Sequence, residues 1–233
     1  LHSATMVKAG VFLLARLWPI LAGTELYTVT VTSVGLVTMI FGAVVALFRH
    51  DLKSILAYST ISQLGMLVML LGFSLEAAAL AAVLHILNHA AFKAALFMSA
   101  GIVEHETGTR DIRRLGGLAK AMPVTALVAT LAAASMAGLP PLGGFISKEL
   151  MLYETPKLAL LGLPWLLPVL ATLGATFSVG YSLRLAVHLF FGQPREAEPF
   201  ARAHDPGLGM WAAPALLTAL AVAIATAVHL AIA

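Results

Sequence analysis

The chain contains a series of continuous apolar runs, and each is about as long as a helix needs to be to cross a bilayer. The run from Ala212 to Ala227, for example, holds no charged residue. Strands of a transmembrane barrel would alternate apolar and polar residues instead. A soluble domain carries about 25% charged residues, whereas 11% of these 233 residues are charged and 60% are hydrophobic. Both a soluble fold and disorder are therefore excluded.

Charged residues, glycines and prolines divide these runs into about seven expected transmembrane helices. We place them at residues 1–22, 28–49, 54–73, 76–103, 123–157, 163–192 and 209–232. The fold class is thus all-α and polytopic, with residues 1–233 forming a single transmembrane domain. The first residues read as the inside of a hydrophobic helix rather than as a signal sequence. We therefore expect the chain to be a fragment of a longer membrane protein.

The fifth span, 123–157, is expected to break in the middle. Proline removes a backbone donor and clashes with the preceding turn. A break at membrane depth is tolerated only inside protein or beside a wet cavity, and such discontinuous helices mark transport sites. A packed proline kink is the alternative. The residues that predict the break are Gly138, Pro140, Pro141, Gly143 and Gly144.

The distribution of Lys and Arg predicts the orientation of the spans. The segments after the second, fourth and sixth spans are basic, whereas the opposite segments hold only Lys157. Since basic residues favour the cytoplasmic side, these even-numbered connections are predicted to be cytoplasmic. The basic residues are Arg49, Lys53, Arg110, Arg113, Arg114, Lys120, Arg195 and Arg202.

Three titratable residues of the fourth span recur at i, i+4 and i+8. His85, His89 and Lys93 should therefore share one helix face over about 12 Å. Histidine passes protons near neutral pH, and a buried lysine can alternate between charged and neutral forms. The pattern predicts a proton relay, with paired packing histidines or a metal or haem site as alternatives. Lys93 would repel a metal cation and the chain has no cysteine, so we expect no metal and no cofactor.

Two further spans carry lysines away from their predicted ends. Lys148 is expected in the first turn of the second half-helix, where the helix dipole disfavours its charge. The neighbouring Glu149 and the carbonyl end of the first half-helix favour that charge, so a switchable carrier is predicted, with a purely structural contact as the alternative. In the first span, His2 and Lys8 are separated by six residues and indicate little by spacing alone.

Five stretches of the sequence resemble a known family, the proton-translocating antiporter-like membrane subunits. That family includes subunits of NADH:quinone oxidoreductase and of the Mrp-type cation/proton antiporters. The stretch at 105–118 is most similar to the A-subunit branch of the Mrp antiporters. The stretches are HSATMVKAG (2–10), HDLKSILAYSTISQLG (50–65), HILNHAAFKAALF (85–97), HETGTRDIRRLGGL (105–118) and AGLPPLGGFISKE (137–149).

The resemblance implies two inverted repeats, each with a broken helix and a key lysine, of which this chain would supply the end of the first, all of the second and a final helix. It implies that Lys148 is the broken-helix lysine, that His85, His89 and Lys93 connect the path, and that His2 and Lys8 link it to the first repeat. The function that it implies is proton translocation in a multisubunit exchanger of protons for a monovalent cation, with Na⁺ as the expected cation, in a bacterial inner membrane. The expected partners are other subunits and the lipid bilayer, without nucleic acid.

Other functions remain open from the sequence. The nearest alternative is a proton-pumping subunit of NADH:quinone oxidoreductase or of a related respiratory complex. A redox module that binds haem or quinone through His85 and His89 is a second alternative, and an inert scaffold fragment is a third.

Overall fold

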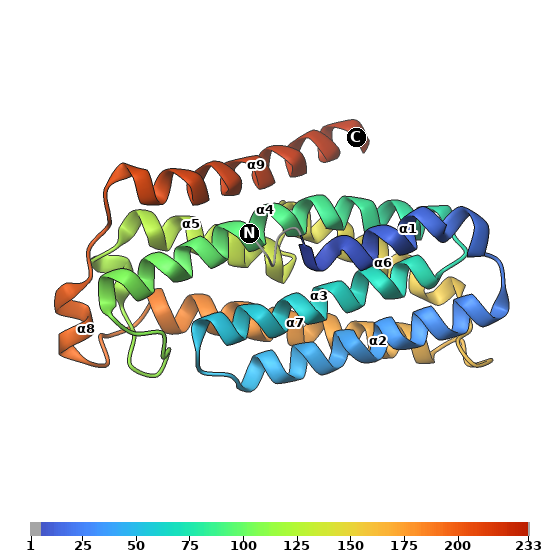
Figure 1. The fold of residues 1–233 in the computed structure, drawn as a ribbon, viewed down its shortest axis with the longest axis horizontal. Helices are drawn as coiled ribbons and strands as arrows, with labels where there is room; N and C mark the ends of the chain where they lie inside the picture. The colour runs from blue at the N-terminus through green and yellow to red at the C-terminus, as the bar shows by residue number, and fades with distance from the viewer. Residues whose placement is uncertain (1–5, 233) are drawn as a thin grey trace.

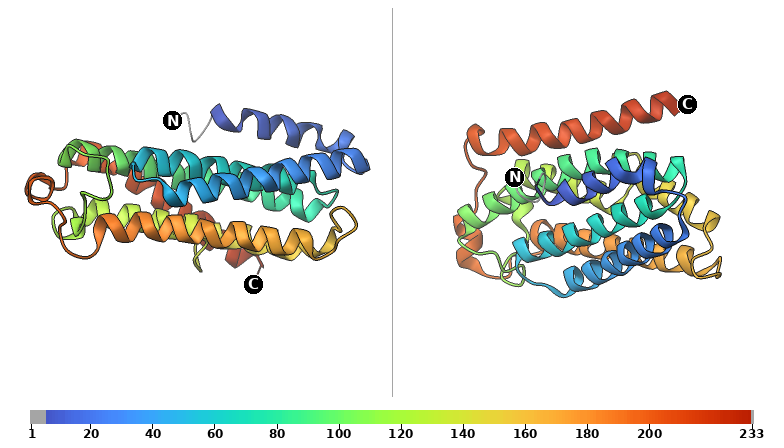
Figure 2. Two further views of the ribbon diagram at one scale, coloured as in Figure 1. Left: turned by 90° about the horizontal axis from the view of Figure 1, so that it is seen from below. Right: turned by 45° about the vertical axis from the view of Figure 1, so that its right-hand side comes forward.

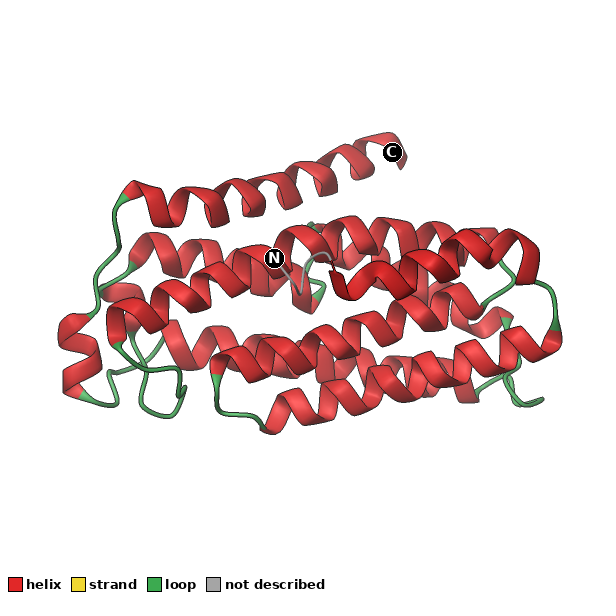
Figure 3. Cartoon of the chain, viewed as in Figure 1, coloured by secondary structure: helices red, strands yellow, loops and turns green. Residues whose placement is uncertain are grey.

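The computed structural model describes residues 6–232, and these residues form helices joined by loops without a strand (Figure 3). The axes of the longer helices run roughly parallel or antiparallel to one another in one elongated bundle (Figure 1). The helices are η1 (Met6–Lys8), α1 (Ala9–Leu21), α2 (Glu25–Phe48), α3 (Leu52–Gly72), α4 (Glu76–Thr107), η2 (Leu118–Lys120), α5 (Pro123–Ala137), α6 (Gly143–Glu154), η3 (Thr155–Lys157), α7 (Leu166–Phe190), α8 (Ala197–Arg202) and α9 (Leu208–Ile232).

The predicted all-α membrane fold is confirmed. Among the described residues, α2, α3, α4, α7 and the part of α9 up to Ala227 are each long and apolar enough to cross a membrane. The expected fifth span is present as two shorter helices, α5 and α6, separated by residues 138–142. The short α8 lies in a connection that the hydropathy pattern treats as a loop.

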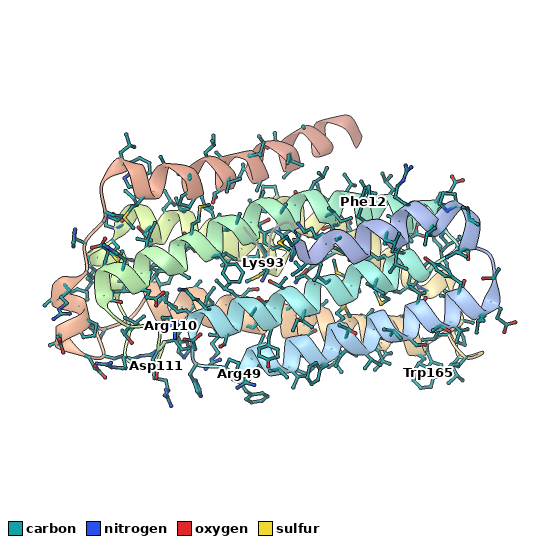
Figure 4. The ribbon with its side chains drawn as sticks, in the orientation of Figure 1. Phe12, Arg49, Lys93, Arg110, Asp111 and Trp165 are labelled. Carbon is teal, nitrogen blue, oxygen red and sulfur yellow. The ribbon has the colours of Figure 1, made fainter. Side chains whose placement is uncertain are left out.

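The connections after α2, α4 and α7 lie at the same end of the bundle, on the left in Figure 1. Figure 4 shows Arg49, Arg110 and Asp111 at this end, Trp165 at the other end and Lys93 between them. Figure 2 shows that α9 lies on one flank, where it packs against α4 and α5. The charged loops therefore lie at the end of the bundle, away from the middle, where Lys93 lies.

The helix α3 lies inside the bundle, where it contacts α1, α2, α4 and α7. Glycines allow it to approach α2 closely, as small residues commonly do between membrane helices. A Cβ atom on Gly42 would lie 2.5 Å from the backbone nitrogen of Ser62, and one on Gly65 would collide with the backbone of Met39. Polar residues of α3 are consequently held deep in the protein, facing α4 and α7.

Ion pairs and caps organise the charged end. Asp51 accepts a hydrogen bond from the backbone nitrogen of Ser54 at 2.8 Å, which caps α3, and it also pairs with Arg110 at 3.1 Å. Hydrogen bonds from Arg113 lower the pKa of Asp111 to about 2, so this carboxylate stays charged at physiological pH. These contacts join the short connection before α3 to the long one after α4.

Arg184 of α7 lies near the charged end of the bundle, where an arginine could simply extend to the bilayer surface. Its guanidinium instead donates to the carbonyl oxygens of Leu47, at 2.5 Å, and Arg49, at 2.6 Å. These carbonyls lie at the end of α2, where backbone acceptors have no partner within the helix. Arg184 therefore joins α7 to the end of α2.

Candidate functional site

The face of α4 that carries His85, His89 and Lys93 points into the protein, and all three residues are completely buried. The ring centroids of His85 and His89 lie 5.9 Å apart. Phe92 contacts both rings edge-on, with centroid distances of 6.2 and 5.4 Å. The structure thus brings the three titratable residues into one row away from bulk water.

His85 is held through both ring nitrogens. Its Nδ1 lies 2.7 Å from Ser147 Oγ, and its Nε2 lies 2.8 Å from Gln63 Oε1. An amide oxygen only accepts, so Nε2 carries the proton and Nδ1 accepts the hydrogen bond of Ser147. Haem ligation through His85 would have to break one of these bonds, which weakens that alternative.

Gln63 connects His85 to α7. Its amide nitrogen donates to Tyr181 OH at 2.7 Å and to Ser178 Oγ at 3.0 Å. Ser178 Oγ in turn donates to Tyr181 OH at 2.9 Å. All three side chains are buried, so these polar groups satisfy one another without water.

Lys148 meets the same cluster from α6. Its Nζ donates to Ser178 Oγ at 2.8 Å and to the carbonyl oxygens of Met136 and Ala137, each at 2.9 Å. The lysine lies in the second turn of α6, not in the first as the sequence predicts, because this helix begins already at Gly143. Glu149 is exposed, and within residues 6–232 it forms no ion pair with Lys148. The carbonyl end of α5, and not Glu149, directly contacts the ammonium group.

The break between α5 and α6 makes this contact possible. Gly138 ends α5 with φ of 85°, a conformation that favours glycine. A Cβ atom there would also lie 2.8 Å from Cδ of Lys148. Gly143 and Gly144 begin α6 beyond Pro140 and Pro141, and a side chain on Gly144 would collide with the carbonyl of Ser135. The glycines therefore allow the two half-helices and the lysine to lie in direct contact.

Lys93 lies beyond His89 in the row. Its Nζ donates to Ser59 Oγ and, at 3.2 Å, to the carbonyl of Leu56, both on α3. His89 is different, since neither of its ring nitrogens has a hydrogen-bond partner in the part of the chain that the structure describes. The direct chain of hydrogen bonds from Lys148 thus reaches His85, and a gap at His89 separates it from Lys93.

Lys8 lies beside the row of titratable residues on α4. It is buried, and its Nζ donates to the carbonyl of Ile86 on α4 at 3.2 Å. The predicted partner His2 lies outside the described residues. The structure therefore places Lys8 beside the row, at the residue that follows His85 along α4.

Uncharged residues complete the site, and they were not predicted from the sequence. A search for charged or titratable residues in apolar spans does not find hydroxyl and amide side chains. A polar cluster inside an apolar span, such as Ser59 to Gln63, is the signal that would have found two of them. The missed residues are Ser59, Gln63, Ser147, Ser178 and Tyr181.

Two cavities reach Lys148. A cavity of about 370 Å³ lies between the helix break and α7, and its lining includes Lys148, Glu149 and Thr176. A cavity of about 10 Å³ is lined in part by Gln63, Lys148 and Ser178, and this is close to the room that one water molecule needs. The described part of the chain contains no group of three or more His, Cys, Asp or Glu side chains that could hold a metal ion.

Comparison with known proteins gives a match to the family described as "NADH:quinone oxidoreductase/Mrp antiporter, TM", whose sequence model covers residues 1–177. The A/B component of a probable K⁺/H⁺ antiporter of Rhizobium meliloti is 54% identical over 88% of this chain and 21% of its own length. The A component of the Na⁺/H⁺ antiporter of Bacillus subtilis is 45% identical over 96% of this chain and 30% of its own.

The solved structures show the same relationship. A chain of the Mrp complex from Dietzia sp. DQ12-45-1b superimposes with a TM-score of 0.84 at 41% identity, over 96% of this chain and 24% of that one. The present chain thus spans less than a third of the length of these proteins.

Proposed function

Since the chain belongs to the NADH:quinone oxidoreductase/Mrp antiporter transmembrane family, we propose that it forms the proton-translocating part of a subunit that exchanges protons for a monovalent cation. The observation that carries this proposal is the continuous set of hydrogen bonds from Lys148 through Ser178, Tyr181 and Gln63 to His85. It joins the broken helix to the row of titratable residues on α4, in the interior of a multi-pass membrane protein.

The members of this path have different roles. Lys148, His85, His89 and Lys93 gain and lose protons, whereas the hydroxyls of Ser178 and Tyr181 can pass a proton on. An amide does neither readily, so Gln63 positions its neighbours and fixes the tautomer of His85. A water molecule in the small cavity beside Gln63 would carry the proton past the amide.

The two buried lysines at the ends of this path can each change between a charged and a neutral form, as a proton carrier must. Neither Lys148 nor Lys93 has a carboxylate partner within the described residues 6–232, and their contacts are carbonyl and hydroxyl oxygens. Desolvation opposes the charged form while these oxygens favour it. Both protonation states are therefore accessible to a carrier.

The remaining parts of the exchanger would lie outside this chain. The relatives named above belong to Na⁺/H⁺ and K⁺/H⁺ antiporters, and this chain matches less than a third of each. We propose that the rest of the polypeptide, together with further membrane subunits, completes the path. The identity to these antiporter proteins favours antiport over the respiratory alternative that the family also includes.

Gln63→Leu tests the path because it removes the link between His85 and α7 while keeping the volume of the side chain. Because Gln63 holds His85 against α7, its loss should displace the groups that carry the proton, so we expect proton-coupled transport to fall about tenfold or more. The measurement is the cation-driven pH change in membrane vesicles that contain equal amounts of the assembled complex.

Ser182→Ala is the matched control. This buried hydroxyl donates to the carbonyl of Ser178 in its own helix, so we expect transport at the parental rate. Parental transport by the Gln63→Leu complex would show that the hydrogen-bonded path is not used.

The orientation of the bundle is a separate part of the proposal. The end that carries the basic connections is placed in the cytoplasm because Lys and Arg favour that side. Single cysteines at Arg113 or Arg202, in an otherwise cysteine-free protein, should react with an impermeant thiol reagent only from the cytoplasm. A cysteine at Glu76 should react only from outside, and the reverse pattern would invert the assignment.

A further inference from the structure

We infer that a polar cavity at the charged end of the bundle binds the phosphate group of an anionic phospholipid. The cavity has a volume of about 370 Å³, and its lining includes Phe48, Arg49, His50, Ser54 and Arg113. It lies just beyond Phe48, the last residue of α2, which is long and apolar enough to cross a membrane. Since lipid headgroups lie at this level, directly outside the hydrocarbon core, we call it the headgroup cavity.

Two arginines of the headgroup cavity have N–H donors to spare. The guanidinium of Arg49 lies over the ring of Tyr58, 5.0 Å from its centroid, and forms no ion pair with a carboxylate within residues 6–232. Arg113 binds Asp111 through Nε and Nη2, at 3.0 and 2.6 Å, which leaves its Nη1 to donate. Both are suited to an anionic headgroup, because guanidinium groups form strong, charge-assisted hydrogen bonds with phosphate.

His50 and Ser54 add uncharged donors beside these arginines. Arg184 donates to Nδ1 of His50 at 2.8 Å, and because a guanidinium only donates, the proton of the neutral imidazole is on Nε2. Ser54 is bound to Asp51 through its backbone nitrogen, and its hydroxyl has no hydrogen-bond partner among the described residues. A phosphate group has several acceptor oxygens, so it can bind these donors and the guanidinium groups together.

Two acidic residues, Asp51 and Asp111, also line the headgroup cavity, but arginines neutralise both. Asp51 pairs with Arg110 at 3.1 Å, and Asp111 pairs with Arg113 at 2.6 Å. An antiparallel backbone bridge between Asp51 and Asp111 holds the two connections side by side. The cavity is therefore formed before any ligand binds.

The two connections that form the headgroup cavity have an excess of positive charge. Residues 49–54 and 110–114 contain five basic and two acidic residues. Glu104 and Glu196 form ion pairs with these segments from other elements and still leave a net positive charge, to which Arg184 of α7 adds. Basic pockets of this kind between membrane helices bind anionic headgroups.

An exposed apolar face of α2 leads from the headgroup cavity toward the middle of the membrane. Val37, Phe41 and Phe48 lie on this face, with exposed fractions of 66%, 57% and 71%. They extend over about 16 Å, which is close to the roughly 15 Å of hydrocarbon in one leaflet. A phospholipid would use both the cavity and this face, since its acyl chains add apolar contact to the attraction between charges. A free phosphate ion would use the cavity alone.

The test measures equilibrium binding of radioactive dioleoyl phosphatidylglycerol to the purified full complex in detergent. Arg49→Gln and Arg113→Gln should each weaken binding about fivefold, since this is the contribution of one basic residue near an anionic lipid. Arg114→Gln is the matched control, because it removes the same charge from the same connection. Arg114 pairs with Glu196 at 2.7 Å and lies outside the cavity lining, so binding should stay near the parental affinity.

Two competitors distinguish the possible sources of the phosphate group. Inorganic phosphate has the charge but no acyl chain, so at the same concentration as the lipid it should not displace the label. Unlabelled phosphatidylcholine has acyl chains but no net charge, so it should displace the label less than unlabelled phosphatidylglycerol does. Displacement by an equal concentration of inorganic phosphate would assign the cavity to a free anion and overturn the lipid site.

Gel filtration of the same samples, with analysis of their subunits, shows whether each variant is assembled. Equal lipid binding by the parental complex and an assembled double variant, Arg49→Gln with Arg113→Gln, would overturn the site. Absence of lipid binding by the parental complex, together with loss of another subunit from the double variant, would identify this face as a contact between subunits instead.

Discussion

Lys93→Met is expected to abolish proton-coupled transport by the assembled complex while leaving assembly intact. Methionine keeps most of the volume and suits the buried position, so the bundle should still pack. It cannot take up a proton, and the path would then end at His89, with only Ser59 and the carbonyl of Leu56 beyond it. The cation-driven pH change in vesicles should fall to the level of vesicles without the complex.

Lys53→Ala is the control for this experiment. Lys53 pairs with Glu104 at 2.5 Å at the charged end, and both side chains are partly exposed. Such surface pairs contribute about 0–1 kcal/mol, so transport should stay near the parental rate. Transport near the parental rate by the assembled Lys93→Met complex would show that the proton does not pass along the row of titratable residues on α4.

The fold could be predicted from the sequence to within a few residues at most helix ends. Each span buries an apolar run between charges or helix-breaking residues, so local composition decides its position. The clearest difference is α4, which hydropathy predicts to end at residue 103 and which continues to Thr107, where Gly108 ends it in the left-handed conformation. Glu104 and Glu106 nevertheless lie inside this helix, where Glu104 pairs with Arg110 at 3.6 Å and Glu106 lies 3.2 Å from His204.

The site could be predicted only in part. Charged residues in apolar spans are conspicuous, so Lys93, Lys148 and the two histidines of α4 were found. Their connections depend on which helices touch, and hydropathy does not contain this information. The contact between Gln63 and Tyr181 joins residues 118 positions apart, and a tyrosine in an apolar span is ordinary. Lys148 and Glu149 also illustrate the limit, because neighbours in sequence point in different directions on a helix, and no ion pair joins these two residues in the described part of the chain.

Lys148→Arg should eliminate antiport as completely as Lys148→Ala does, and this pair of variants separates a carrier from a structural charge. A guanidinium can donate to the carbonyls of Met136 and Ala137 as the ammonium does, so a charge that only holds the two half-helices together should survive the change to arginine. A carrier should not survive it, because arginine does not deprotonate in proteins.

The measurement is the cation-driven pH change in vesicles, with the amount of assembled complex matched across variants. Lys120→Arg makes the same replacement at an exposed position at the end of η2, before α5, and it should leave transport unchanged. Arginine is bulkier than lysine and Gly138 packs against the aliphatic part of this side chain, so thermal stability of each complex in detergent is measured alongside. A stable Lys148→Arg complex without transport supports a proton carrier at this residue. If arginine restores transport to near the parental rate while alanine does not, Lys148 acts through its fixed charge, and the proton must cross the broken helix by another route.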